Sequence, residues 1–161
     1  MSHWKTGKLE LKCSLSVLKR ALINVMPRWE EYIQADEGSQ LSIHNSYTNQ
    51  TQKGFALVVP GGDNPMGGTV PGIKPAQPRI SYADMGFKKN PDGTWAVEVD
   101  TMGLPREIRD IEASLQDEVA RMKVRALAAS RGYQIVNEER AGDQTYIDMI
   151  VPVEEQYRLQ G

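Results

Sequence analysis

Few side chains in this sequence could ligate a metal ion or act as a nucleophile. The soft ligands are His3, His44 and Cys13, and they stand in no CxxC, HExxH or GxSxG pattern. A structural zinc site normally needs four protein ligands. Cys13 alternates in phase with Leu9 and Leu11, which is typical of a small buried residue. We therefore predict no metal, no cofactor and no catalytic residue, and we expect that the protein is not an enzyme.

A proline- and glycine-rich segment, Pro60–Pro78, contains glycines of the kind that cradle a phosphate. A Walker A loop needs Gly-Lys and then Ser or Thr at the start of a helix, so that the lysine reaches the phosphates. Here Thr69 follows Gly68 with no lysine between them, and Pro71 comes soon after. The segment is predicted to be a long flexible loop. The functional alternative is a loop that orders on a partner, and a third interpretation makes it the lid of an enzyme pocket. The candidate partner contacts in the loop are Asn64, Met66 and Ile73.

The segment Lys53-Gly54-Phe55-Ala56 copies the start of the RNP1 pattern of RNA-binding sheets. An RNP1 strand carries aromatic side chains that stack on bases. Phe55 would be one of them, but the second aromatic position holds Leu57. A plain core strand is therefore the favoured interpretation. Single-stranded RNA binding by the sheet face, with Lys53 and Phe55 as contacts, is the alternative function.

The composition is that of an ordinary globular protein. The 161 residues are 40% hydrophobic and 25% charged, and the net charge is −2. A dedicated nucleic-acid-binding protein usually has an excess of basic residues, which this chain lacks. The single cysteine excludes a disulfide within the chain, and no apolar run is long enough to cross a membrane. We expect a cytoplasmic protein, or one of the plastid stroma if its source is an alga.

The elements that must position these residues are predicted from periodicity and capping. Lys8–Cys13 alternates as a strand, and Ser14 caps a helix that ends before Pro27. Aromatic and β-branched residues indicate further strands. Those strands are Trp29–Ile33, Gln40–Ser46 and a central one at Phe55–Val59.

The stretch Tyr82–Gly103 is predicted to be a β-hairpin. Asn90-Pro91-Asp92-Gly93 suits a type I turn, because Asn caps it, Pro presets φ and Gly accepts the left-handed conformation. Alternate residues of the second strand, beginning at Trp95, are apolar and are expected in the core. Gly86 in the first strand indicates either a bulge or a close approach of the backbone.

A long helix and a second hairpin are predicted for the last third of the chain. Apolar residues recur at steps of three and four from Ile108 to Ala126. Pro105 is near the expected start of this helix, and Gly132 is at its end. The strands of the following hairpin are Tyr133–Glu139 and Gln144–Val151.

These elements together predict an α+β fold. Strands that come as hairpins make a mostly antiparallel sheet, and the two helices are expected on one face of it. A ferredoxin-like core with added strands is the economical architecture. Residues 1–153 are expected to form a single domain with a Pro/Gly-rich loop at 60–78, followed by a flexible tail at 154–161.

Several segments of the chain, taken in order, resemble the Ycf35 family, also called DUF1257. They are MSHW at the N-terminus, KLELKCSLSVLKRAL, YTNQTQKGFALVV, the hairpin Tyr82–Gly103 and RALAASRGYQIVNEE. The resemblance spans Met1 to Val151. The family occurs in cyanobacteria and red-algal plastids, with relatives in scattered bacteria and phages, and no activity is established for it. Its genes often stand beside genes of AAA-type ATPases.

The resemblance implies a non-enzymatic protein that acts through protein contacts. Such a protein would be an adaptor to a larger assembly or to an AAA-type ATPase, or a self-assembling subunit. Candidate contacts outside the loop are His3 and Trp4 at the N-terminus, and Met102, where the family tends to carry aromatic residues. Packing of Trp4 on the sheet is the favoured role for that side chain, and anchoring a partner is the alternative. An open sheet edge could also add a strand from another chain.

Overall fold

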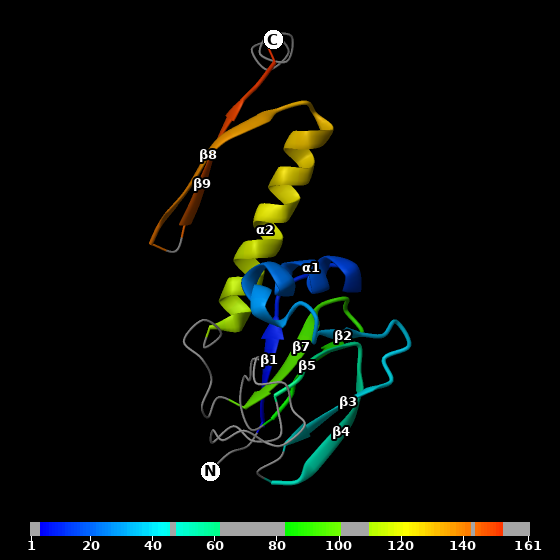
Figure 1. Cartoon of the computed structure of the whole chain (residues 1–161). Coiled ribbons are helices and arrows are strands. Elements are labelled where there is room, and N and C mark those ends of the chain that lie inside the picture. Colours follow the sequence, from blue (N-terminus) through cyan, green and yellow to red (C-terminus); the bar gives the residue numbers. More distant parts are fainter. Residues whose placement is uncertain (1–3, 46–47, 62–82, 101–109, 143, 153–161) are drawn as a thin grey trace. The chain divides into compact units, whose positions relative to one another are not determined.

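The computed structural model describes residues 4–45, 48–61, 83–100, 110–142 and 144–152. The chain divides into two units, Met1–Val119 and Ala120–Gly161, and one long helix contributes to both (Figure 1). The predicted α+β fold is confirmed by two helices and a mostly antiparallel sheet of five strands. The expected loop beyond Gly61 and the expected C-terminal tail lie outside the described residues.

Twelve elements follow one another along the described chain, in three antiparallel sheets ordered β1-β7-β6-β5-β2, β3-β4 and β8-β9. They are β1 (Trp4–Leu9), α1 (Leu15–Val25), the 3-10 helix η1 (Pro27–Trp29), β2 (Gln34–Ala35), β3 (Leu41–Asn45), β4 (Gln50–Phe55), β5 (Leu57–Val59), β6 (Met85–Lys89), β7 (Trp95–Asp100), α2 (Ile111–Ser130), β8 (Gln134–Ala141) and β9 (Gln144–Ile150).

The course β1–α1–β6–β7–α2 follows the first five elements of the ferredoxin-like βαββαβ pattern, with β2 to β5 inserted after α1. In that pattern the strand after the second helix joins the same sheet. Among the described residues it does not do so here, because β8 pairs with β9 in a sheet of their own.

One face of the five-stranded sheet is buried toward the helices. The register places Leu57, Phe87 and Val97 side by side on this face, and all three are fully buried. Trp95 lies on the same face and donates from Nε1 to the Cys13 carbonyl, 3.1 Å away, just before α1. The Asn24 amide of α1 donates to Glu118 of α2 at 3.0 Å, which ties the two helices together.

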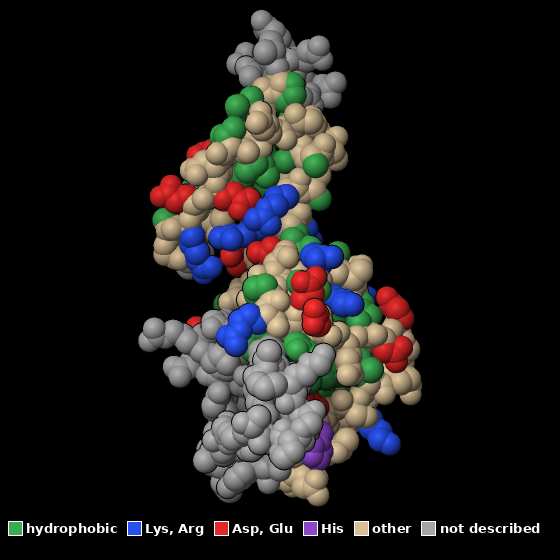
Figure 2. Space-filling model, viewed as in Figure 1, with side chains coloured by type: hydrophobic (Ala, Val, Ile, Leu, Met, Phe, Trp, Pro, Cys, Tyr) green, Lys and Arg blue, Asp and Glu red, His purple; other side chains and the backbone are tan. Residues whose placement is uncertain are grey.

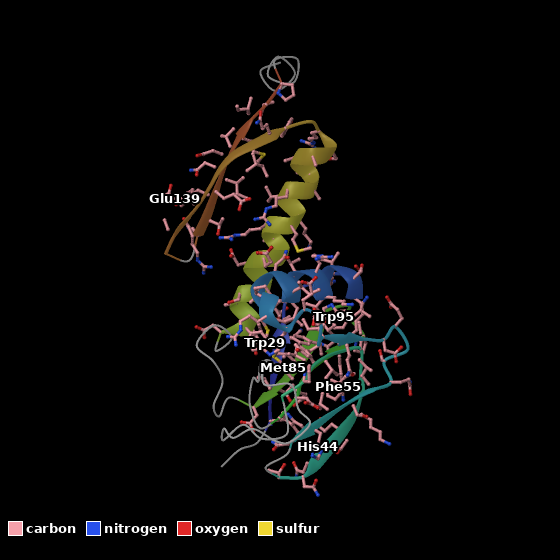
Figure 3. All side chains as sticks on the ribbon, viewed as in Figure 1. Trp29, His44, Phe55, Met85, Trp95 and Glu139 are labelled. Atoms are coloured by element: carbon pink, nitrogen blue, oxygen red, sulfur yellow. The ribbon has the colours of Figure 1, made fainter. Side chains whose placement is uncertain are left out.

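The opposite face is covered at one end by β3 and β4. Ile43, Phe55 and Val58 form a buried cluster there, and Trp4 and Leu41 pack against it. Figure 3 shows Phe55 and Trp95 within the interior of this unit. Gly86 of β6 lies directly under the cluster, because an added Cβ would be 2.5 Å from Phe55 Cδ1 and 2.7 Å from Ile43 Cγ2. Of the two roles predicted for Gly86, the close backbone approach is therefore the one observed.

The helix cap and the helix ends that were predicted from the sequence form at the predicted residues. The Ser14 hydroxyl accepts the Val17 amide at 3.3 Å and caps α1, which ends at Val25 before Pro27. Gly132, with φ +71°, ends α2. The amide after it, that of Tyr133, donates to Ala128 O at 2.8 Å, as in a Schellman cap.

Three predicted strands are wrong in their extent, and one of them, Phe55–Val59, is divided at Ala56 between the end of β4 and β5. The strand expected at Lys8–Cys13 is instead β1, and it ends at Leu9 because its partner β7 begins opposite, at Trp95. Trp29–Ile33 is no strand, since Tyr32 and Ile33 both donate their amides back to the Trp29 carbonyl in a turn. Trp29 and Ile33 are nevertheless buried, so their apolar character reports the core rather than extended backbone.

The turn of the β6–β7 hairpin forms as predicted. The Gly93 amide donates to Asn90 O at 2.9 Å, and Gly93 has φ +88°, a conformation that favours glycine. Inside the turn, Asp92 Oδ1 accepts the hydroxyl of Thr94 and also its amide, which is 2.9 Å away. The turn is thus held by a side chain as well as by backbone.

Asp92 is expected to stay ionised at unusually low pH. The hydroxyl of Thr94, and then its amide, lower the pKa of Asp92 to about 2. Because this folded pKa is below that of an unfolded aspartate, the resulting stabilisation is complete above the unfolded pKa and is lost as pH falls through about 2. The variant Thr94→Val should raise the pKa of Asp92, as measured by NMR titration of the carboxyl carbon. An unchanged pKa in that variant would contradict the hydrogen bond.

In the second unit, the C-terminal half of α2 packs on the β8–β9 hairpin. Arg121 donates to Thr145 at 3.4 Å, and Arg125 makes two bonds to Glu138, of 2.9 and 2.7 Å. Ala128, on the same side of the helix, is buried. The apolar stripe predicted as far as Ala126 therefore holds only to Val119, after which the helix buries a different side against a different sheet.

Candidate functional site

The described residues contain no group of three or more His, Cys, Asp or Glu side chains placed to hold a metal ion. His44 is half-buried, and its Nδ1 is 3.1 Å from the Thr51 hydroxyl. An open hollow of about 430 Å³ lies beside α1, lined by Ser16, Lys19, Arg20, Ile23 and Glu30. Its charges are of both signs, and Glu30 is the one carboxylate among the described residues that line it.

Asp84 is the centre of a polar junction. Its two carboxylate oxygens accept the amides of His44 and Gly61 at 2.9 and 2.7 Å. Beside it, the buried Asn45 donates to the buried Asp100 at 3.2 Å. Because both oxygens of Asp84 are used by backbone amides, this carboxylate joins chain segments and is not placed as an acid or a base.

An apolar surface distinguishes the second unit. Among the described residues, the large hydrophobic side chains that are exposed all lie in Ala120–Gly161. Figure 2 shows hydrophobic side chains at the surface of this unit, interspersed with charged ones. The exposed side chains are Leu127 (52%), Val136 (52%), Tyr146 (53%), Met149 (38%) and Ile150 (55%).

The register of the hairpin separates a face toward α2 from a face away from it. Glu138 pairs with Ile147, and the bonds from Arg125 place this pair on the α2 side. The alternate pair, Glu139 with Tyr146, is on the other side, and Glu139 extends away from α2 (Figure 3). Ile150 is in phase with Tyr146. The exposed Val136 is the extra residue where the register shifts between Ile135 and Asn137.

We call Val136, Tyr146 and Ile150 the outer hairpin face. Polar residues lie among them, and the Asn137 amide donates to Asp148 at 3.4 Å across the strands. The Tyr146 hydroxyl donates to the Gln144 side chain at 2.7 Å. The face is therefore ordered by its own hydrogen bonds and still presents three large apolar side chains.

The two long edges of this sheet differ in charge. β8 carries Glu138, Glu139 and Arg140, and charged side chains are one of the means by which proteins block an open edge. β9, with the sequence QTYIDMI, carries Asp148 alone. Among the described residues β9 pairs with β8 only.

The structure describes only some of the predicted site residues. Trp4 is half-buried on the Ile43–Phe55–Val58 cluster, and its Nε1 donates to the Asp84 carbonyl at 3.1 Å, so the packing role is the one observed. Phe55 is fully buried, while Lys53 is exposed. Those outside the described residues are His3, Asn64, Met66, Ile73 and Met102.

The outer hairpin face is absent from the sequence-based list of contacts, although β9 carries a signal for it. A strand covered on one face alternates apolar with polar residues. Tyr146 and Ile147 are adjacent and apolar, and so are Met149 and Ile150, so both faces of β9 are apolar. That pattern is typical of a strand covered on both sides, and α2 covers one side only.

None of the described helices is long and apolar enough to cross a membrane. Comparison of the chain with protein-family models, with curated proteins and with solved structures finds no match in any of the three.

Proposed function

We propose that this protein is a non-enzymatic interaction module that binds a protein partner through the outer hairpin face. It would act in the cytoplasm, as an adaptor to a larger assembly or as a self-assembling subunit. The observation that carries the proposal is the exposure of Val136, Tyr146 and Ile150 on one hairpin, each more than half exposed. Exposed apolar side chains that gather on one surface are often functional.

The chemistry of the described residues supports a binding role over a catalytic one. The hollow beside α1 is open and combines charges of both signs, and both oxygens of Asp84 are used by backbone amides. The hairpin, by contrast, offers what protein interfaces are enriched in, which is a tyrosine and aliphatic side chains with a polar surround. The Ycf35 resemblance points the same way, toward an accessory or adaptor protein, and membership of that family remains a prediction.

Substitution of the face tests the proposal. The double variant Tyr146→Thr/Ile150→Thr keeps β-forming residues while it removes most of the apolar area. Affinity capture from the native host, followed by titration of the purified partner, should show partner binding weakened about 10-fold or more by this variant. The matched control is Leu127→Gln, which changes an equally exposed residue on α2 to another good helix former.

We expect the control to bind its partner as the parent chain does. Equal binding by the parent and the double variant would show that the hairpin face is not the site. Equal loss in the double variant and the control would also contradict the assignment to this face. Circular dichroism melts of all three proteins must coincide, so that loss of folding is not taken for loss of contact.

RNA binding is not favoured by any observation on the described residues. A base-stacking role needs an exposed aromatic ring on the sheet, and Phe55 is fully buried. Lys88 Nζ lies over one face of the Phe55 ring, 4.4 Å from its centre.

A further inference from the structure

The outer hairpin face is acidic as well as apolar. The hairpin Gln134–Ile150 carries four acidic residues and a single basic one, Arg140. Glu139 pairs directly with Tyr146, and Asp148 follows Tyr146 two residues later on the same face. We propose that the outer hairpin face binds a basic amphipathic helix of a partner protein, which carries Lys or Arg one turn apart beside large apolar side chains. This inference rests on the proposed function and names the chemistry of the partner.

The two carboxylates on this face have no cation of their own. Glu139 and Asp148 make no ion pair with any residue in the described part of the chain. Arg140 is in phase with Glu138, on the α2 side of the hairpin, and its Nε donates to Gly142 O at 3.3 Å. Carboxylates that lie beside exposed apolar side chains and lack a cation are complementary to a partner that supplies one.

The other face of the same hairpin already receives a helix by this chemistry. On α2, Arg125 donates twice to Glu138 of β8, and Arg121, one helical turn earlier, donates to β9 at 3.4 Å. Residues four apart on a helix have Cβ atoms about 5–6 Å apart. Glu139 and Asp148 are diagonal neighbours across the two strands, which separates them by about 7–8 Å. Long basic side chains one turn apart on a helix can therefore reach both carboxylates.

The same charges argue against other occupants of the face. Tyr146 lies between the two carboxylates, so any surface that covers its ring also approaches both of them. Phosphates of nucleic acids and of anionic lipids would be repelled there. A second copy docked face to face would bring its own carboxylates against these, and like charges brought together at an interface cost binding free energy. A basic partner is the one that these charges favour.

The probe is a synthetic helical peptide of about 18 residues, long enough to be partly helical in water. It is based on alanine, with leucines along one side and a pair of arginines one turn apart beside them. Fluorescence anisotropy with the full chain should give a dissociation constant on the order of 100 μM, because one helix on one hairpin is a small interface. Replacing the two arginines by glutamates should weaken binding about 10-fold or more.

The contribution of the carboxylates is measured in the variant Glu139→Gln/Asp148→Asn. It removes both charges at nearly constant shape, and the new amide oxygen can still accept from Asn137. We expect the arginine peptide to bind about 10-fold more weakly, and raising the salt from about 0.05 to about 0.5 M should then change its affinity less than in the parent chain. The matched control, Glu30→Gln/Glu31→Gln, changes the net charge equally at exposed positions in the first unit and should bind as the parent does. Equal weakening in both variants would assign the effect to net charge and overturn the proposal.

The variant Tyr146→Thr/Ile150→Thr separates this inference from the proposed function. A natural partner that is weakened by this variant but binds Glu139→Gln/Asp148→Asn as it binds the parent chain would overturn the basic helix and leave the proposed function intact. Failure of the arginine peptide to bind, or equal binding of the glutamate peptide, would also overturn the basic helix. A natural partner that neither double variant weakens would overturn both. Weaker binding of the arginine peptide in both double variants, with the control unchanged, supports both.

Discussion

The variant Phe55→Ala is expected to lose about 3–5 kcal/mol of unfolding free energy, because it leaves a cavity beneath a fully buried ring. Phe55 is the end of β4 and packs with Ile43 and Val58 between two sheets, where Trp4 and Leu41 close the cluster. The chain bends at Ala56, directly after Phe55, and β5 begins at Leu57. Because both neighbouring strands are fixed in sheets, we expect the backbone to close little of the space that the ring leaves. Chemical denaturation of the full chain, followed by tryptophan fluorescence, measures the loss.

The expected instability of Phe55→Ala makes this variant unsuitable as a test of RNA binding. Loss of an RNA complex in Phe55→Ala would report unfolding, so it could not identify a base-stacking residue. Lys53→Ala is the informative variant, because Lys53 is exposed on β4 and its removal leaves the core intact. The Phe55 prediction is contradicted if Phe55→Ala unfolds at the same denaturant concentration as the parent chain.

The variant Gly86→Ala is expected to cost about 2–3 kcal/mol, because the added methyl group overpacks a filled core. Its Cβ would be 2.5 Å from Phe55 Cδ1 and 2.7 Å from Ile43 Cγ2, closer than nonbonded carbon atoms come in proteins. Both neighbours are fully buried, so neither can swing outward into solvent. The same denaturation experiment measures the change.

A double variant shows whether the Phe55 ring is the cause. Phe55→Val removes the ring atoms that meet the new methyl group and has no Cδ atom, so Gly86→Ala should cost less in the Phe55→Val background than in the parent chain. We expect a coupling free energy of about 1 kcal/mol or more between the two sites. Strictly additive costs would show that Gly86 is required for another reason, such as backbone conformation.

Features of the sequence that act over a few residues were predicted well. The cap at Ser14, the stop before Pro27, the turn at Asn90–Gly93 and the helix end at Gly132 all form where the residues indicate. Each depends on a side chain or a permissive backbone that meets a neighbour at most five residues away. Such contacts exist in nearly any fold that the chain could adopt, so the sequence alone specifies them.

The candidate site could not be found from local signals. The list of contacts from the sequence relied on large residues in unusual segments, and Trp4, the one of its partner contacts that the structure describes, packs on the core. The apolar side chains that are exposed lie instead in a hairpin whose pattern fits a strand covered on both faces. Exposure is a property of what covers a residue, and a single sequence does not state which elements come together.

By itself, then, the sequence determined the α+β class, the turns and caps, and the absence of a familiar catalytic motif. Only the tertiary structure decided that β1 ends at Leu9, opposite the first residue of β7, and that α2 changes its buried side after Val119. It also decided that α2 covers one face of β9, while Tyr146 and Ile150 on the other face are exposed. The physical reason is the same in each case. The end of a strand and the buried side of a helix are set by elements that are distant in the chain. The spacing of apolar residues in the sequence shows only that some element must cover them.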